Sequence, residues 1–193
     1  MNDNELIEEI YRRFHAAAEE TFAARIMNLR IDDLPFVNPD GTPFGNVMHL
    51  VRDGKDKSGA FFDIYRLGWF QGRLWELVIV DGVYLSHSHP NIDSEFIIMQ
   101  GGGHLSHDDL WGKYEKRTRT TVGRGIGHAF ITDPALGPTV FISIQSDPIR
   151  QIIIDQGTGN KTFVDDFVYV DDKYPLPPHL LAERNGKMAP APA

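Results

Sequence analysis

Apolar residues in the first part of the chain recur at the spacing of an α-helix. Leu6, Ile10, Phe14, Phe22 and Ile26 fall near one helical face. This pattern predicts an amphipathic helix over residues 1–29, with its apolar stripe packed on the barrel or across a dimer. The periodicity then stops, and the Asn-Pro-Asp-Gly sequence at residues 38–41 is a turn signal. We therefore expect a linker over residues 30–45.

From residue 46 onward, short apolar or alternating segments are separated by turn pairs such as Asp-Gly and Gln-Gly. About ten short strands at this spacing favour an all-β domain, built as one closed or sandwiched antiparallel barrel, over residues 46–171. The Pro-rich segment 172–193 is predicted to be an extended tail. The expected strands lie near residues 46–51, 60–66, 74–80, 83–89, 95–99, 117–122, 128–131, 139–144, 151–154 and 162–170.

Composition and charge narrow the function classes. The 193 residues suffice for one domain with a sizeable core. The net charge of −8 argues against nucleic acid or an anionic membrane surface as the main partner. Because the chain has no cysteine, disulfides, thiolate ligands and cysteine nucleophiles are excluded. No apolar run approaches the roughly 20 residues of a membrane span, and the acidic N-terminus is unlike a signal peptide, so we expect a cytoplasmic protein.

Metal-ligating residue types gather in one part of the predicted barrel. His87 and His89 project to the same side of an extended strand, because side chains alternate between faces. Glu95 opens the next strand across a short polar turn, and His128 begins a later strand. We therefore predict a single metal site with the ligands His87, His89, Glu95 and His128.

The predicted ligand set suits one divalent transition metal. Three imidazoles and one carboxylate without sulfur can bind Fe, Mn, Ni, Co or Zn, and the general affinity order does not choose among these metals. Four protein ligands in an octahedral shell leave two positions for substrate, water or dioxygen. Such open positions are typical of a catalytic metal site.

The same residues resemble the two sequence motifs of the cupin superfamily. The resemblance implies a single cupin-like antiparallel β-barrel (a jelly roll) that binds a metal, with iron favoured, and it leaves the subfamily open. Gly123 and Thr132 stand where the second motif has a proline and an asparagine. The first motif is matched by Gly82, His87, His89, Glu95 and Gly102, and the core of the second by Gly125 and His128.

Three functions are compatible with this resemblance. The first is an Fe(II)-type dioxygenase acting on a small polar organic molecule, because redox members are common in the superfamily. The second is a non-redox isomerase, epimerase or lyase, in which the metal acts as a Lewis acid and Glu95 or Glu76 moves a proton. The third is a cupin that binds a small ligand without turning it over. For each function we expect a homodimer.

Glu76 is the only charged residue in an otherwise apolar strand, residues 74–80. A strand that is apolar on both faces is predicted to be buried, so Glu76 either pairs with a cation such as Arg66 or Arg73, or serves as an acid or base. Farther along the chain, we interpret residues 101–103 as a turn. His104 and His107, beside Asp108 and Asp109, could form a second site or a lid over the first, and we favour a solvated polar loop.

Overall fold

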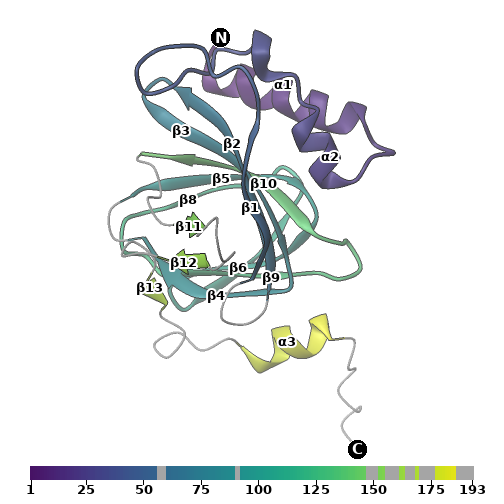
Figure 1. The fold of residues 1–193 in the computed structure, drawn as a ribbon. Coiled ribbons are helices and arrows are strands. Elements are labelled where there is room, and N and C mark those ends of the chain that lie inside the picture. Colours follow the sequence, from purple (N-terminus) through teal and green to yellow (C-terminus); the bar gives the residue numbers. More distant parts are fainter. Residues whose placement is uncertain are drawn as a thin grey trace, which may run out of the picture.

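The chain begins with two helices that lie on one side of a β-barrel (Figure 1). The computed structural model describes residues 1–55, 60–89, 92–146, 152–154, 161–163, 168–169 and 177–185. Helix α1 (Asp3–Ala16) begins at a capping box, in which Asn2 and Glu5 each accept a hydrogen bond from the other's backbone N–H group. Helix α2 (Phe22–Met27) is separate, because Thr21 caps a new start by accepting from Ala24 N. The sequence predicted one helix here, and the structure has two.

Eleven strands of the described residues form two antiparallel sheets, and β11 (Ile152–Ile154) with β12 (Lys161–Phe163) forms a third, short one. The six-stranded sheet has the order β1-β2-β3-β10-β5-β8. Its strands are β1 (Met48–Lys55), β2 (Phe61–Phe70), β3 (Arg73–Asp81), β10 (Thr139–Gln145), β5 (Ser94–Gln100) and β8 (Arg119–Val122). The five-stranded sheet has the order β13-β4-β9-β6-β7. Its strands are β13 (Val168–Tyr169), β4 (Val83–Ser88), β9 (His128–Thr132), β6 (Gly102–His107) and β7 (Leu110–Glu115). The predicted antiparallel β fold with an N-terminal helix is confirmed.

The central strands of the six-stranded sheet, β3 and β10, are buried on both faces. On β3, Trp75 and Leu77 belong to a core shared with α1, whereas Val78 and Val80 belong to a second core between the two sheets. The short helix η1 (Ile31–Asp33) also packs into the first core through Ile31. Because helices cover the outer face of this sheet, residues 74–80 of β3 are apolar on both faces apart from Glu76.

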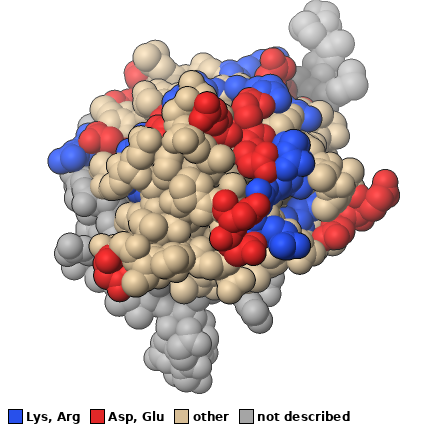
Figure 2. Space-filling view, turned by 90° about the horizontal axis from the view of Figure 1, so that it is seen from above, with Lys and Arg blue, Asp and Glu red and all other residues tan. Residues whose placement is uncertain are grey.

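Ion pairs join α1 to the sheet that it covers. Asp3 pairs with Arg73 of β3, and Glu8 pairs with Arg117 just before β8, with an N–O distance of 2.7 Å. In Figure 2, the view from above, acidic and basic side chains lie next to one another across this face. The charged surface here is therefore largely neutralised locally.

Strands β6 and β7 form a hairpin that the sequence did not predict. Residues 102–107 form β6, where the sequence predicted a turn at residues 101–103 and a polar loop at His104 and His107. Strand β6 is paired with β7 on one side and with β9 on the other. Gly103 has φ +151° and lies against the Ile131 carbonyl group, where a side chain would clash. Glycine is therefore required for this close approach of β6 to β9.

The C-terminal part contains a helix within the segment that the sequence predicted to be an extended tail. Helix α3 (Pro178–Arg184) packs at the opposite end of the barrel from α1 (Figure 1), with Leu180 buried and Arg184 paired with Asp81 at 3.4 Å. The rest of the predicted tail, residues 172–176 and 186–193, lies outside the described residues.

Candidate metal centre

Three buried histidines meet inside the barrel. His87 is on β4, His89 follows the end of that strand, and His128 is the first residue of β9. One ligand atom from each of the three side chains lies within 4.8 Å of the others. The rings of His87 and His128 are 4.2 Å apart between centroids, and His89 is 5.1 Å from each. Within the described part of the chain, this is the one group of at least three such side chains close enough to share a metal ion.

The strand pairing and one loop bring the histidines together. His87 is directly opposite His128 in the antiparallel β4–β9 pair, and a register shift in β4 lies between Tyr84 and His87. The loop before His128 is held in place because Gly125 N donates to the His89 carbonyl oxygen at 2.9 Å. The backbone thus connects the second histidine to the loop that supplies the third.

His128 is prepared for metal binding by its surroundings. Its Nδ1 lies 3.2 Å from the Ile126 carbonyl oxygen, which can only accept, so Nδ1 carries the proton and Nε2 is left as the ligand atom. Burial, and next the nearby His87, lower the pKa of His128 well below its ordinary value. A neutral imidazole with a free nitrogen is the form that binds metals, so the three-histidine donor set fits a divalent transition metal.

Glu95 does not join the histidines, which differs from the prediction. It lies on β5 next to Phe96, and the Phe96 ring is inside the barrel, 5.7 Å from the His128 ring. Because neighbouring strand residues face opposite sides, Glu95 points outward toward α1. There it pairs with Arg119 and, at 3.6 Å, with Arg73. The structure therefore gives Glu95 a place in the ion pairs between the sheet and α1.

Glu76 lies inside the barrel and is paired with Arg66. Its side chain lies on the same face of β3 as Val78 and Val80, which belong to the core between the sheets. The residue is 2% exposed. Its Oε1 accepts from Nε and Nη2 of Arg66 at 3.0 and 2.9 Å, and its Oε2 accepts from Gln145 at 3.3 Å. Burial raises the pKa of Glu76, although the Arg66 charge opposes this effect. Of the two arginines considered from the sequence, Arg66 is the partner.

Strand registers place Glu76 at one level of the barrel with two of the clustered histidines, His87 and His128. Arg66 is paired with Glu76, Glu76 with Ser143, Ser143 with Phe96, and Phe96 with Thr120 across the six-stranded sheet. In the five-stranded sheet, His107 is paired with His128, and His128 with His87. Thr120 and His107 connect the two sheets by a contact of 3.3 Å between Oγ1 and Nε2. We call this set the polar ring.

An apolar layer lies next to the polar ring, two residues farther along each strand and three in β4, where the register shifts. Its members are paired with one another across neighbouring strands, as the members of the polar ring are, and all belong to the core between the sheets. They are Ile64, Val78, Phe141, Ile98, Leu105, Phe130 and Tyr84. The barrel interior therefore changes from apolar to polar at the level of the histidines.

His107 is a titratable member of the polar ring that the sequence interpretation did not assign to the predicted metal site. It was interpreted as part of a polar loop because histidine and aspartate residues commonly populate loops, and the glycine-rich start of β6 has little strand propensity. The signal that would have placed it is Asp108-Asp109, a hairpin turn in which Asp108 has φ +52°. A strand ending at His107 puts its side chain beside His128.

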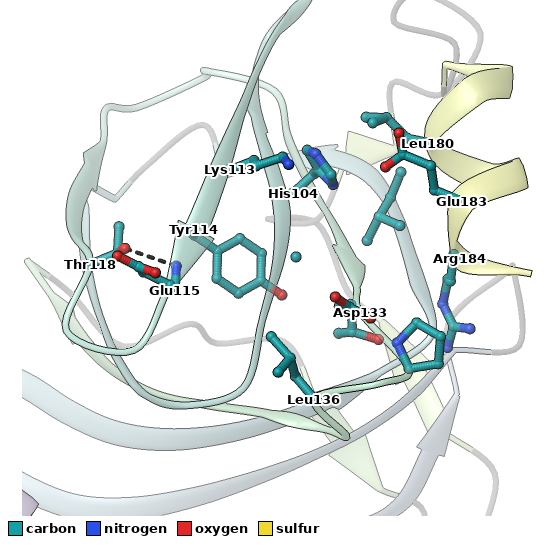
Figure 3. Close-up of a pocket in the computed structure, with 14 residues that line it drawn as sticks. His104, Lys113, Tyr114, Glu115, Thr118, Asp133, Leu136, Leu180, Glu183 and Arg184 are labelled. Atoms are coloured by element: carbon teal, nitrogen blue, oxygen red, sulfur yellow. Dashed lines mark hydrogen bonds between the residues drawn. The ribbon is translucent and has the colours of Figure 1, made fainter. Parts of the chain in front are cut away.

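A separate pocket lies on the outside of the barrel, between α3 and the five-stranded sheet (Figure 3). It has a volume of about 520 Å³. Its lining includes His104, Lys113 and Tyr114 from the β6–β7 hairpin, and Glu183 and Arg184 from α3. None of the three clustered histidines contributes to it, so it is distinct from the candidate metal centre.

Solved structures similar to this chain include cupin proteins. One is a cupin-2 domain protein from Shewanella frigidimarina, with 19% identity over 41% of this chain and 74% of that chain, and a TM-score of 0.37. Another is a cupin-2 domain protein from Rhodospirillum rubrum, with 15% identity, coverages of 53% and 70%, and a TM-score of 0.43. A third is ectoine synthase from P. lautus, with 9% identity, coverages of 45% and 64%, and a TM-score of 0.39. Neither a family model nor a curated protein matches the sequence.

The fold is a cupin-like antiparallel β-barrel. Two facing antiparallel sheets and a histidine cluster inside them agree with the resemblance found in the sequence motifs.

Among the helices of the described residues, none has the length and apolar character needed to cross a membrane.

Proposed function

We propose that this protein is a metal-dependent enzyme that acts on a small polar organic molecule. The observation that carries the proposal is the group of three buried histidines with ligand atoms within 4.8 Å of one another. Three protein ligands leave positions for exogenous ligands on a metal that prefers four or more, as catalytic sites require. We propose one bound divalent ion, Fe, Mn, Ni, Co or Zn, with Fe(II) first.

The first candidate reaction is that of an Fe(II)-type dioxygenase. The bound metal would supply redox chemistry, and the chain would supply three neutral nitrogen ligands in a site shielded from water. Exposures of 1% for His87 and His128 and 5% for His89 support this role, because a water-excluded site protects reactive species from side reactions.

The second candidate is a non-redox isomerase, epimerase or lyase, and Glu76 favours it. This carboxyl group lies in the polar ring with His87 and His128, and its pKa is raised by burial. A carboxyl group with a raised pKa is suited to moving a proton at neutral pH. In this proposal Glu76 exchanges the proton with the substrate, and Arg66 holds the carboxyl group in position through its two hydrogen bonds.

One experiment separates the candidates. Metal would be measured in protein purified without added metal, and the loaded protein then assayed for oxygen uptake and for isomerised or cleaved products with a panel of small acids and diols. Oxygen uptake supports the dioxygenase, and product formation without oxygen uptake supports the second candidate. Metal binding without any turnover would support a ligand-binding protein instead, and absence of bound metal would contradict the proposal.

The residue-level test compares Glu76→Gln with Glu115→Gln. Glu115 is exposed on β7, so its variant is the matched control. If Glu76 moves a proton, Glu76→Gln retains the metal and loses turnover by about a hundredfold or more, while the control is unaffected. Unchanged turnover in Glu76→Gln would remove it from the reaction.

A further inference from the structure

Gln145 carries a buried polar atom without a partner in the described structure. It is the last residue of β10 and is 2% exposed. Its Nε2 donates to Glu76 Oε2 at 3.3 Å and to Ser143 Oγ at 3.0 Å. Its carbonyl oxygen, Oε1, has no hydrogen-bond partner among the described residues. A buried acceptor left in this state costs free energy, which a ligand that donates a hydrogen bond would recover.

The orientation of the amide follows from its partners. As long as Glu76 is ionised, its Oε2 can only accept, so the amide nitrogen must face it and the amide oxygen is turned away. Turning the amide over would place two acceptors together. The unpaired group at this position is therefore an acceptor, and the ligand must supply the donor.

Gln145 lies next to the polar ring, on the sheet that faces the histidines. Its side chain lies on the same face of β10 as those of Ser143 and Phe141, and Phe141 belongs to the core between the sheets. Ser143 is paired with Phe96, the residue whose ring lies 5.7 Å from His128. Facing sheets are about 10 Å apart, so a small molecule held at the histidines can reach the polar side chains of the opposite sheet.

We infer that Gln145 binds a hydroxyl group of the substrate, so that the substrate is a small hydroxylated molecule with a second oxygen group that faces the histidines. This inference rests on the proposed metal-dependent function. A hydroxyl group fits better than an ammonium group, because the Arg66 guanidinium contacts the same Glu76 carboxylate and would repel a second cation. A hydroxyl group can also accept a hydrogen bond while it donates to Gln145.

The test measures ligand affinity and needs no turnover. Co(II)-loaded protein would be titrated by calorimetry with lactate and β-hydroxypropanoate, each compared with the analogue that carries fluorine in place of the hydroxyl group. Fluorine is of similar size and cannot donate. We expect at least one hydroxylated acid to bind about tenfold more tightly than its fluorinated analogue, the difference expected for satisfying a buried acceptor.

Two variants test whether Gln145 is the residue that causes the preference for the hydroxylated acid. Gln145→Met removes the acceptor at nearly constant volume and should abolish the preference. Ser143→Ala is the matched control, because it removes one partner of Nε2 and leaves Oε1 in place, so the preference should remain. If Gln145→Met does not fold, Gln145→Leu takes its place.

The outcomes separate this inference from the proposed function. Failure to bind Co(II) in a manner that depends on His87, His89 and His128 would overturn the proposed function itself. Normal metal binding with equal affinities for the hydroxylated and fluorinated acids would overturn only the role of Gln145. A preference that survives in Gln145→Met would also overturn it, because the metal alone would then be selecting the hydroxyl group.

Discussion

Arg66 and Glu76 form an ion pair inside the barrel, in which two guanidinium nitrogens donate to one carboxylate oxygen at 3.0 and 2.9 Å. The pair lies in the polar ring that also contains His128. An ionised carboxylate that is 2% exposed is costly even when it is paired, and this explains why burial raises the pKa of Glu76. Burial of this pair therefore lowers the stability of the folded protein, at the level of the barrel where His128 lies.

The stability of the protein should consequently depend on the ionisation of Glu76. Because the pKa is higher in the folded state than the ordinary value of 4.5, unfolding releases a proton from Glu76 in the pH range between the two values. The contribution of Glu76 to stability is thus complete below about pH 4.5 and declines as the pH rises through the folded-state pKa. Glu76→Gln removes this decline. When both proteins are unfolded in urea across a pH series, the unfolding free energy of the variant should rise relative to that of the wild type as the pH rises. A difference that does not depend on pH would contradict the raised pKa of Glu76.

Each histidine of the cluster should be required for metal binding. Removing a direct ligand should lower metal affinity by more than the roughly ten- to hundredfold effect of losing an outer partner. We therefore expect His87→Ala, His89→Ala and His128→Ala to lose most of their metal while keeping the wild-type circular dichroism spectrum. His179 is exposed on α3, so His179→Ala serves as the control and should retain the metal. A His128→Ala variant with full metal content would remove that residue from the site.

Metal should be released as the buffer is made acidic. Histidine ligands must be neutral, so protons compete with the metal as the pH falls. Because the pKa of His128 lies well below its ordinary value, this competition should begin below the pH of about 6.5 at which a free imidazole titrates. Metal content after dialysis across a pH series should fall progressively in this range. Content that stays constant into strongly acidic buffer would be incompatible with a site made of three histidines.

Glu95→Gln should leave the metal in place and weaken the contact between the sheet and α1. The Glu95 side chain is 12% exposed, but its partners Arg119 and Arg73 are 47% and 34% exposed. Solvent screens such pairs, so the expected loss of unfolding free energy is about 1 kcal/mol or less. Metal analysis and urea unfolding measure the two effects separately. A loss of metal in this variant would restore Glu95 to the ligand set.

Gly103→Ala should disrupt the approach of β6 to β9. A methyl group at this position would overlap the Ile131 carbonyl oxygen, and φ +151° is unfavourable for alanine. We expect a loss of about 3 kcal/mol or more in unfolding free energy. Gly112 of β7 has no atom within 4 Å of the added carbon, so Gly112→Ala is the matched control and should change stability by less than about 0.5 kcal/mol. Equal effects in urea unfolding would contradict this explanation.

Features that depend on consecutive residues were predictable from the sequence. The helical stripe of α1, most strands of the six-stranded sheet, and the shared face of His87 and His89 all follow from periodicities of neighbouring positions. The alternation of Ile142 and Ile144 with Ser143 and Gln145 likewise accounts for the polar side chains on the inner face of β10, because neighbouring residues face opposite sides. These patterns were sufficient for the cupin-like fold class and for the histidine part of the site.

The faces and partners of distant residues were decided by the tertiary structure. Glu95 follows the histidines closely in sequence, yet the pairing of β5 with β10 and β8 turns it outward, because one step along a strand reverses the side. The register between β2 and β3 places Arg66 directly opposite Glu76, whereas Arg73, three residues before Glu76 on the same strand, faces α1 on the other side. Strand β6 is recognisable only from its pairing with β7 and β9, which its glycines and polar residues do not reveal. Periodicity is a local property of the chain, whereas register depends on pairings between residues far apart in sequence, and the latter determine which side chains share the barrel interior.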